Sequence, residues 1–492
     1  IPWSQTFDMT EGGTDHAPKF PLPVCWKFML HFAMLSKDPK ASEAVELTLN
    51  KVARGGIYDQ IGGGFARYST DRFWFVPHFE KMLYDNAQLI ELYTEAWHHY
   101  QHPLYQETVE ETVECLLRDF RHPLGGFFSA YDADSEGEEG KYYVWTVEEI
   151  RQELAGEAEL ILKYYNIEPD GNWESGKNIL FRSKSDDEFA KEHGLSAAEW
   201  LAKRNQLKNQ LLQARASRIA PGLDDKVLTS WNGLAIKALF KASVAFGRAD
   251  WQEAAIEALN FILTNLTDDG RLMRSWKNGK GYINGFADDY AFVIEALLEA
   301  YRSTFDSIWA RQAKNFMDYA IQHFSHDQTA LFFYTSKLDP ALIARKQELY
   351  DNVIPSANAS LAHSLKTLGW LFEQDTYSHR SRQMLDNVWE QVKSYGASYA
   401  CWADLALRFV IHEPEIVFSG NQALSLRDEL AAHPMLMQLS GGCLVESTDL
   451  PVLAQRWQEE ANCVYVCRNS TCELPTTDLE QVARLIEFPS SN

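Results

Sequence analysis

Residues 55–96 combine residue types that small-molecule sites use: two glycine clusters, several aromatic side chains and a block of ionisable groups. The aromatic residues include Tyr68 and Trp74, and the ionisable block includes His78 and Asp85. Glycines let the backbone turn tightly, and aromatic faces with a few convergent polar groups line ligand pockets. We therefore predict that this segment holds part of a small-molecule site.

The ionisable block of this segment suggests acid/base chemistry. If a helix covers 78–101, His78 and Asp85 are seven residues apart on one face, and His78 would be a general base with Asp85 as its partner. The alternative is a capped helix start with Glu80 and Lys81 in solvent. We expect Ala at His78 or Asp85 to abolish ligand binding and leave the fold intact.

Two later segments also carry carboxylates. Asp132 and Asp134 would point the same way if extended, and such a pair can perform acid/base chemistry or bind a hard cation. The segment lacks the glycine and closing glutamate of a calcium loop. The alternative interpretation of this segment is an acidic turn exposed to solvent. Asp225 and Lys226 precede Trp231, which would stack on a ligand; here the alternative is a helix cap.

Further candidates lie at predicted helix starts. Asp288 and Asp289 open one helix, and the helix dipole alone favours a carboxylate there by about 0.3–1 kcal/mol. Adjacent residues project about 100° apart, so one of the two can face inward. The predicted catalytic residues are His78, Asp85, Asp132, Asp225 and Asp289, and the predicted substrate contacts are Tyr68, Trp74, Glu80, Tyr84, Asp134, Lys226, Trp231, Asn232, Tyr290 and Asn358.

Helical periodicity dominates the elements that must position these residues. The predicted helices pair as 24–37 with 40–54, 78–101 with 104–120, 229–248 with 251–265, 286–304 with 306–324 and 356–373 with 377–394, and a last helix covers 398–412. Short turn-and-strand segments with similar sequences accompany the pairs, as in an internal repeat. Hairpins repeated in this way can close into a ring, and six of them make an (α/α)6 toroid.

The fold class expected is mainly α, with one barrel over 1–412. Residues 121–225 form an insertion, in which we predict a β-hairpin (126–131 with 141–145) and a charged helix at 195–216. The sequence pattern of residues 413–492 differs from that of the barrel and predicts a small C-terminal α/β appendage.

Composition limits the partners. The chain has 492 residues, is 46% hydrophobic and carries a formal net charge of -23, which argues against nucleic acid or an anionic membrane as a partner. No run is apolar enough to span a membrane, and no signal peptide is visible. We expect a cytoplasmic protein that needs no cofactor and no metal.

Seven cysteines are present, of which Cys463, Cys467 and Cys472 cluster near the end. Their spacing lacks the paired knuckles of a structural zinc site. Free thiols are the expectation for a reducing compartment, and the alternatives are a Cys467–Cys472 disulfide or a metal.

Five ordered motifs over nearly the whole chain resemble the spermatogenesis-associated protein 20 family: GGIYDQIGGGFARYSTDRFWFVPHFEKMLYDN, GGFFSAYDADSEGEEGKYYVWT, DDKVLTSWNGLAIKAL, DDYAFVIEALLEAY and YVCRNSTCELP. The resemblance implies a six-hairpin glycosidase-like barrel related to N-acylglucosamine 2-epimerase and cellobiose 2-epimerase. It also implies an upstream thioredoxin-like domain with a Cys-His-Trp-Cys motif, which this sequence does not contain. We expect that domain to have been truncated or to lie outside the chain.

Two classes of function follow. The first is a carbohydrate-active barrel that binds or transforms a sugar-like molecule, either by epimerase-like chemistry with two bases or by glycosidase-like chemistry with two carboxylates. The second is a non-catalytic ligand-binding or scaffold barrel that works with a thioredoxin-like domain. A third, a cysteine-based redox protein, rests only on Cys467 and Cys472.

Overall fold

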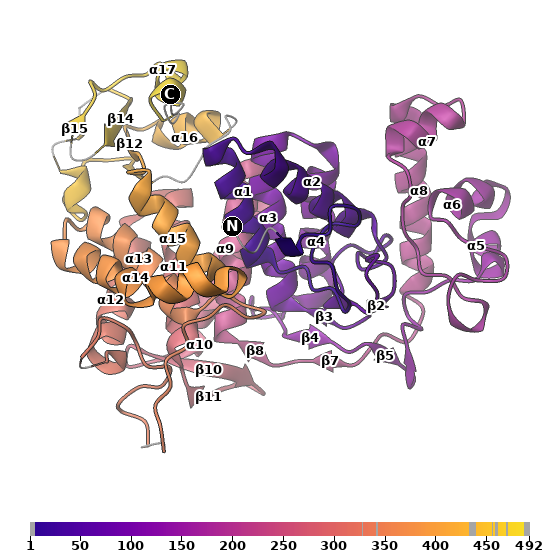
Figure 1. Cartoon of the computed structure of the whole chain (residues 1–492), viewed down its shortest axis with the longest axis horizontal. Helices are drawn as coiled ribbons and strands as arrows, with labels where there is room; N and C mark the ends of the chain where they lie inside the picture. The colour runs from indigo at the N-terminus through magenta and orange to yellow at the C-terminus, as the bar shows by residue number, and fades with distance from the viewer. Residues whose placement is uncertain are drawn as a thin grey trace.

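The computed structural model describes residues 5–326, 328–340, 343–431, 439–454, 456–457, 461–468 and 471–486. At its centre is a ring of helices in which each packs against the next along the chain and the last packs against the first. These inner helices are α1 (Pro23–Ser36), α3 (Leu83–Tyr100), α9 (Thr229–Phe246), α11 (Ala287–Thr304), α13 (Ala357–Leu371) and α15 (Ala400–Val410). Figure 1 shows them running roughly side by side through the body of the molecule.

An outer layer of helices surrounds this ring, each packed on the inner helix that precedes it. The outer helices are α2 (Pro39–Arg54), α4 (Pro103–Cys115, continued by the π-helical turn Leu116–Phe120), α10 (Ala249–Asn265), α12 (Ser307–Phe324) and α14 (Asp375–Tyr395). The five predicted pairs and the (α/α)6 toroid are confirmed. Within the described residues α15 is followed by a strand, so the sixth hairpin is represented by its inner helix.

The two layers differ in how they are buried. Outer helix α12 buries one stripe at helical spacing, Ala313, Met317 and Ala320, as a helix with one solvent face does. Inner helix α9 buries Leu234, Ile236, Leu239 and other residues on every side. In the ranges that the structure describes, no helix is both long and apolar enough to cross a membrane.

Small sheets lie at the end of the ring where the inner helices begin, along the bottom of Figure 1. One joins β3 (Lys81–Met82), β4 (Ala130–Tyr131) and β7 (Leu223–Asp224), and another joins β8 (Val227–Leu228), β9 (Thr267–Asp268), β10 (Arg271–Lys277) and β11 (Lys280–Asn284). Their strands lead directly into α3, α9 and α11. This end of the ring, where the inner helices have their N-termini, is called the mouth below.

A repeated side-chain clamp fixes the turns at the mouth. The Asn86 side chain accepts from the backbone N–H of Phe65 and donates to its carbonyl oxygen, at 2.7 and 3.1 Å. Asn232 does the same to Phe127, at 2.7 and 2.9 Å. The Asn358 side chain makes the same two hydrogen bonds to the backbone of Phe332. The Tyr290 hydroxyl accepts a hydrogen bond from the Leu272 N–H. Asn232, Tyr290 and Asn358, predicted as substrate contacts, therefore hold backbone turns.

Two local predictions were wrong. His78 does not start a helix: it lies in β2 (Pro77–His78), which pairs with β1 (Tyr68–Ser69), and α3 begins at Leu83. The hairpin of 126–131 with 141–145 does not form, because β4 pairs with β3 and β7 instead. A shorter hairpin of β5 (Asp134–Ser135) and β6 (Glu138–Glu139) takes its place.

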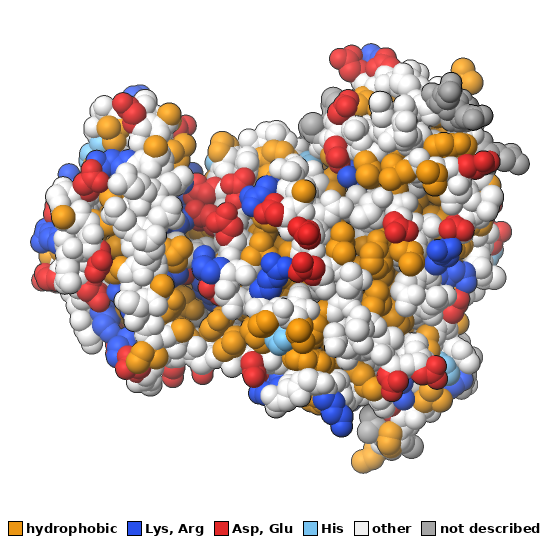
Figure 2. All heavy atoms as spheres, turned by 180° about the vertical axis from the view of Figure 1, so that it is seen from behind, with side chains coloured by type: hydrophobic (Ala, Val, Ile, Leu, Met, Phe, Trp, Pro, Cys, Tyr) orange, Lys and Arg blue, Asp and Glu red, His pale blue; other side chains and the backbone are white. Residues whose placement is uncertain are grey.

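The insertion folds as a lobe of its own, at the right of Figure 1. It contains α5 (Val147–Leu154), α6 (Ala158–Tyr164), α7 (Asp186–Glu192) and α8 (Ala197–Arg215), and α8 confirms the predicted charged helix. These helices bury a separate core that includes Trp145, Trp200 and Leu211. Figure 2, which views the molecule from behind, shows a notch between the top of this lobe and the ring.

The C-terminal unit covers the other end of the ring. Its sheet has the order β13-β12-β14-β15, formed by β12 (Glu415–Ser419), β13 (Leu439–Cys443), β14 (Cys463–Arg468) and β15 (Thr471–Cys472), with α16 (Ala423–Ala431) and α17 (Leu479–Ile486) beside it. The Tyr301 hydroxyl of α11 bonds both the N–H and the carbonyl oxygen of Gly442, at 3.1 Å each. The sulfurs of Cys467 and Cys472 form a disulfide, so the expectation of free thiols was wrong for this pair.

Candidate functional site

A cavity of about 320 Å³ runs along the axis of the ring, the size of a small-molecule site. All six inner helices line it, and residues of the C-terminal unit close one end. Within the described part of the chain, its lining includes none of the residues predicted from sequence. The axial cavity is therefore a candidate site that sequence reasoning missed.

Each inner helix contributes at least one pair of polar residues, four positions apart, to the cavity wall. The pairs are Lys27 and His31, Glu91 and Glu95, Lys237 and Lys241, Glu295 and Glu299, His363 and Thr367, and Asp404 and Arg408. Residues at i and i+4 lie on one helix face, so each pair forms a polar stripe toward the axis. Charge alternates around much of the ring: basic on α1, acidic on α3, basic on α9 and acidic on α11.

Ion pairs between neighbouring helices join these stripes. One Glu91 oxygen lies 3.2 Å from the Lys27 nitrogen, 3.1 Å from that of Lys237 and 2.8 Å from that of Lys241. Burial opposes ionisation, but the three lysines hold the pKa of Glu91 well below its usual range. Glu295 in turn pairs with Lys237 at 3.0 Å. Glu91 is therefore ionised, and ion pairs hold the acidic stripes of α3 and α11 against the basic stripe of α9.

His31 is held between two carboxylates. Its Nδ1 lies 2.6 Å from Asp404 Oδ1 and its Nε2 lies 2.9 Å from Glu95 Oε2. Burial lowers the pKa of His31, but Asp404 and Glu95 outweigh it and raise that pKa to about 9. His31 is therefore a cation at neutral pH.

The α13 stripe is the neutral one. His363 Nε2 lies 3.0 Å from the Cys401 carbonyl oxygen, and Arg408 donates to His363 Nδ1 at 3.1 Å. Burial, assisted by Arg408, lowers the pKa of His363 to about 4. On the next residue along the chain, the buried Ser364 hydroxyl has no hydrogen-bond partner among the described atoms. This wall offers neutral polar groups where the other walls offer paired charges.

The C-terminal unit closes the far end of the cavity with Phe418, Arg427 and Ser440. Arg427 Nη1 donates to the Arg302 carbonyl oxygen at 2.6 Å, close to where α11 ends. Carbonyl groups at helix C-termini carry negative partial charge, which such cations offset. The described residues of the C-terminal unit therefore form the floor of the cavity at this end.

Polar residues at the mouth continue the cavity stripes. Tyr84, Ser230 and Asp288 each stand seven residues before a cavity residue of their helix, Glu91, Lys237 and Glu295. Seven residues are nearly two helical turns, so each shares the face of its successor. The oxygens of Tyr84 and Ser230 are buried without hydrogen-bond partners in the described ranges. The stripes that line the cavity therefore continue on the same helix faces toward the mouth, and this line of positions is called the axial path below.

The mouth gathers several predicted residues around α3. The rings of Tyr84 and Trp231 lie 4.8 Å apart, and Asp85 follows Tyr84 with one carboxylate oxygen buried and unpartnered. Burial raises the pKa of Asp85 well above its usual value, and Arg67 opposes that shift. Arg67 also bonds Glu80 at 3.2 Å.

Two more predicted residues extend this group toward solvent. The His78 ring stacks on Tyr68 at 5.0 Å, and His78 Nε2 lies 3.8 Å from Glu80. His78 Nδ1 also lies 2.9 Å from Glu139 on the edge of the insertion. Tyr68, His78 and Glu80 therefore form the outer part of the group that contains Tyr84, Asp85 and Trp231.

Asp289 joins the mouth from α11. It accepts from the N–H of Ser230 at 2.9 Å and from the N–H of Phe286 at 2.8 Å, and Arg274 donates to it at 3.1 Å. Burial and the neighbouring Asp288 raise the pKa of Asp289 to about 7. Asp289 is therefore partly protonated at neutral pH.

The remaining predicted residues lie elsewhere. Asp132 and Asp134 are exposed beside the insertion, and Asp225 and Lys226 form surface ion pairs with Lys277 and Asp224. Trp74 is fully buried, and its indole donates to the Glu11 carbonyl oxygen at 2.9 Å. None of these five residues is among the described residues that line the axial cavity.

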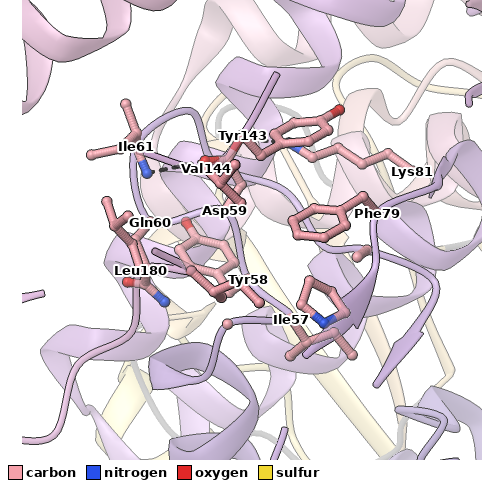
Figure 3. A pocket seen from close by; sticks show the side chains of 14 residues that line it. Ile57, Tyr58, Asp59, Gln60, Ile61, Phe79, Lys81, Tyr143, Val144 and Leu180 are labelled. Atoms are coloured by element: carbon pink, nitrogen blue, oxygen red, sulfur yellow. Dashed lines mark hydrogen bonds and ion pairs between the residues drawn. The ribbon is translucent and has the colours of Figure 1, made fainter. Parts of the chain in front are cut away.

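A second cavity, of about 30 Å³, lies between the ring and the insertion (Figure 3). Lys81 donates to Asp59 and to the Gly63 carbonyl oxygen, each at 2.8 Å, and Arg215 donates to Asp59 at 2.8 Å. The cavity holds about one water molecule, so it cannot hold a sugar. The glycine-rich segment at 55–64 thus joins the insertion to the ring.

No group of three or more potential metal ligands occurs among the residues that the structure describes. The chemistry available is that of proton donors and acceptors on the axial path. Its sequence signal is the polar pair at i and i+4 within an otherwise apolar helix, repeated in every inner helix.

Comparison with known proteins gives close relatives and distant structures. No protein-family model matches the chain. Spermatogenesis-associated protein 20 of Homo sapiens is 31% identical, over 98% of this chain and 67% of that protein. An uncharacterized protein of Caenorhabditis elegans is 30% identical, over 98% of this chain and 72% of its own length.

Among solved structures, a GH76 α-mannanase of Bacteroides thetaiotaomicron matches 76% of this chain and 75% of its own, at 13% identity and a TM-score of 0.42. A sugar epimerase from a ruminal bacterium matches 66% of this chain and 84% of its own, at 15% identity and a TM-score of 0.32.

Proposed function

The chain belongs to the spermatogenesis-associated protein 20 family, and we propose that this member binds a sugar-like small molecule in the axial cavity. The observation that carries the proposal is the cavity of about 320 Å³ with polar stripes from all six inner helices. A hydroxyl-rich ligand needs donors and acceptors at close spacing, and each stripe supplies them.

Unpartnered polar atoms support a ligand on this path. The side-chain oxygens of Tyr84, Ser230 and Ser364 are buried and have no partner in the described structure. A buried polar group without a hydrogen bond costs about 1–3 kcal/mol. Ser364 lines the axial cavity, so a hydroxyl group of a bound sugar would satisfy its oxygen, whereas the Tyr84 and Ser230 oxygens lie outside the lining of that cavity.

The same site would support proton transfer. His31 and His363 both line the cavity, with pKa values of about 9 and about 4. Such a separation assigns His31 as the acid and His363 as the base, and proton abstraction next to a sugar carbonyl requires the pKa of His363 to rise toward neutral in the complex. To expose the base, the ligand would displace Arg408 from His363 Nδ1. At the mouth, Asp85 and Asp289 remain the proposed carboxylate pair, as a glycosidase-like alternative.

One observation favours the second candidate, a barrel that binds without catalysis. Both ring nitrogens of His31 and His363 already have partners, and ion pairs occupy Glu91, Glu95 and Glu295. A network satisfied internally holds the ring together and needs no substrate. In that case the barrel would serve a thioredoxin-like partner domain.

Binding is tested by calorimetric titration with a panel of mono- and disaccharides. Ser364→Ala removes a hydroxyl that has no partner in the free protein, so the thermal midpoint should stay within about 2 °C while affinity falls about five- to tenfold. The matched control is Ser394→Ala on the exposed side of α14. Absence of binding by every sugar would reject the proposal.

Catalysis is tested on the sugars that bind, by NMR in deuterated buffer. Epimerase-like chemistry predicts deuterium at the carbon next to the carbonyl, lost in His363→Asn while binding persists. Glycosidase-like chemistry predicts hydrolysis of a disaccharide, lost in Asp85→Asn. Binding without either reaction would favour the non-catalytic barrel.

A further inference from the structure

Two sulfurs come together at the edge of the C-terminal sheet. Cys467 on β14 stands opposite Cys472 on the edge strand β15, and the two form a disulfide. Cys467 is 1% exposed, whereas Cys472 is exposed. A reagent in solvent therefore reaches the sulfur of Cys472 first.

A guanidinium group lies beside both sulfurs. Arg456 Nη2 is 3.6 Å from Cys467 Sγ and 3.8 Å from Cys472 Sγ. Among the described residues Arg456 makes no ion pair with a carboxylate, and its buried Nη1 has no hydrogen-bond partner. Glu415 stands opposite Cys467 in the sheet, and burial raises the pKa of Glu415. Arg456 is therefore a cation that faces both sulfurs, and a nearby cation stabilises a thiolate.

We propose that Cys467 and Cys472 form a thiol–disulfide exchange site for dithiol reductants. A thiolate of the reductant attacks Cys472 Sγ and forms a mixed disulfide, and the electron pair of the broken bond leaves on Cys467 Sγ beside Arg456. The second thiol of the reductant then attacks its own sulfur in the mixed disulfide and releases Cys472. The reductant becomes a disulfide, and the protein gains two electrons and, at neutral pH, up to two protons.

Location separates this pair from the other cysteines. Cys25, Cys115, Cys443 and Cys463 are free and buried, and Cys401 lines the axial cavity. Exchange should therefore be confined to Cys467 and Cys472. The exchange site does not depend on the proposed sugar site, because the two share no residue.

The test is the rate at which dithiothreitol reduces the full-length protein at pH 7. Aliquots are quenched with acid and alkylated, and the peptides are quantified by mass spectrometry. Removing the cation in Arg456→Gln should slow reduction about three- to tenfold. Arg456→Lys keeps the charge and should recover most of the rate, and Arg382→Gln on α14 is the control. High salt should slow the parent protein somewhat more than Arg456→Gln, because salt screens a partly exposed charge in part.

Two results would overturn the proposal. The first is two free thiols at Cys467 and Cys472 after mild oxidation with diamide. The second is an unchanged rate in Arg456→Gln, measured on protein whose circular dichroism matches the parent.

Discussion

His31 makes folding stability depend on pH in a way that the structure specifies. Its folded pKa of about 9 lies above the ordinary histidine value of 6.5. A raised pKa gives stability that is complete below pH 6.5 and is lost as the pH rises through 9. The difference of about 2.5 units, at 1.36 kcal/mol per unit, corresponds to about 3 kcal/mol.

The perturbation is His31→Gln, and the assay is urea unfolding at intervals from pH 6 to pH 10. Glutamine cannot carry the charge that pairs with Asp404 and Glu95. The variant should therefore be much less stable than the parent at pH 6, and the deficit should shrink by about 3 kcal/mol by pH 10. His379→Gln, at an exposed position on α14, is the matched control and should follow the parent at every pH. A deficit of His31→Gln that stays constant from pH 6 to pH 10 would refute the assigned charge on His31.

Three further predictions concern the scaffold. Asn232→Ala should lower the free energy of unfolding by about 2–3 kcal/mol, because its two hydrogen bonds to a buried turn are lost. The control, Asn387→Ala on the surface, should change that free energy by less than about 0.5 kcal/mol. Equal effects of the two variants in urea unfolding would argue against the clamp. Asp59→Asn leaves two buried cations unpaired and should destabilise by about 3–5 kcal/mol, with faster proteolysis at the insertion; unchanged proteolysis and stability would contradict the buried link. A Cβ at Gly441 would lie 2.8 Å from the Tyr301 hydroxyl. Gly441→Val should therefore disturb the contact between the C-terminal sheet and α11 and speed hydrogen exchange in β12 and β13. Unchanged protection would mean that the sheet does not pack on α11 through this contact.

Helices were the predictable part of the fold. Their apolar stripes have a period of 3.6, and prolines mark starts such as Pro39 and Pro103, which open α2 and α4 as predicted. Short strands were less predictable, because their pairing depends on contacts distant in sequence. Residues 126–131 have the pattern of a hairpin strand, yet β4 pairs with Lys81–Met82 and Leu223–Asp224, which the sequence separates widely.

The helix starts could be located from the sequence. Asp85, Trp231 and Asp289 lie near the starts of α3, α9 and α11 at the mouth because helix starts in a closed ring share one end, and their roles in a site stay predictions. His78 was placed on a helix, but extended backbone carries it to the edge, where it bonds Glu139. The glycine-rich segment suggested a pocket, whereas its glycines allow close approaches such as that of Gly62 to Arg215.

The axial cavity was missed because each of its residues has an ordinary explanation. Glu91 and Glu95 resemble any i, i+4 surface pair on a helix. Only their location on a helix buried on every side shows that they face an interior space. The signal emerges when all the inner helices are aligned, since each carries one such pair.

The most direct test of the account is a crystal structure of the full chain soaked with the sugars of the titration panel. The account predicts ligand density in the axial cavity, within hydrogen-bond distance of Ser364 and the His363 stripe. Density only at other sites, or a cavity that keeps its water at saturating sugar, would contradict it.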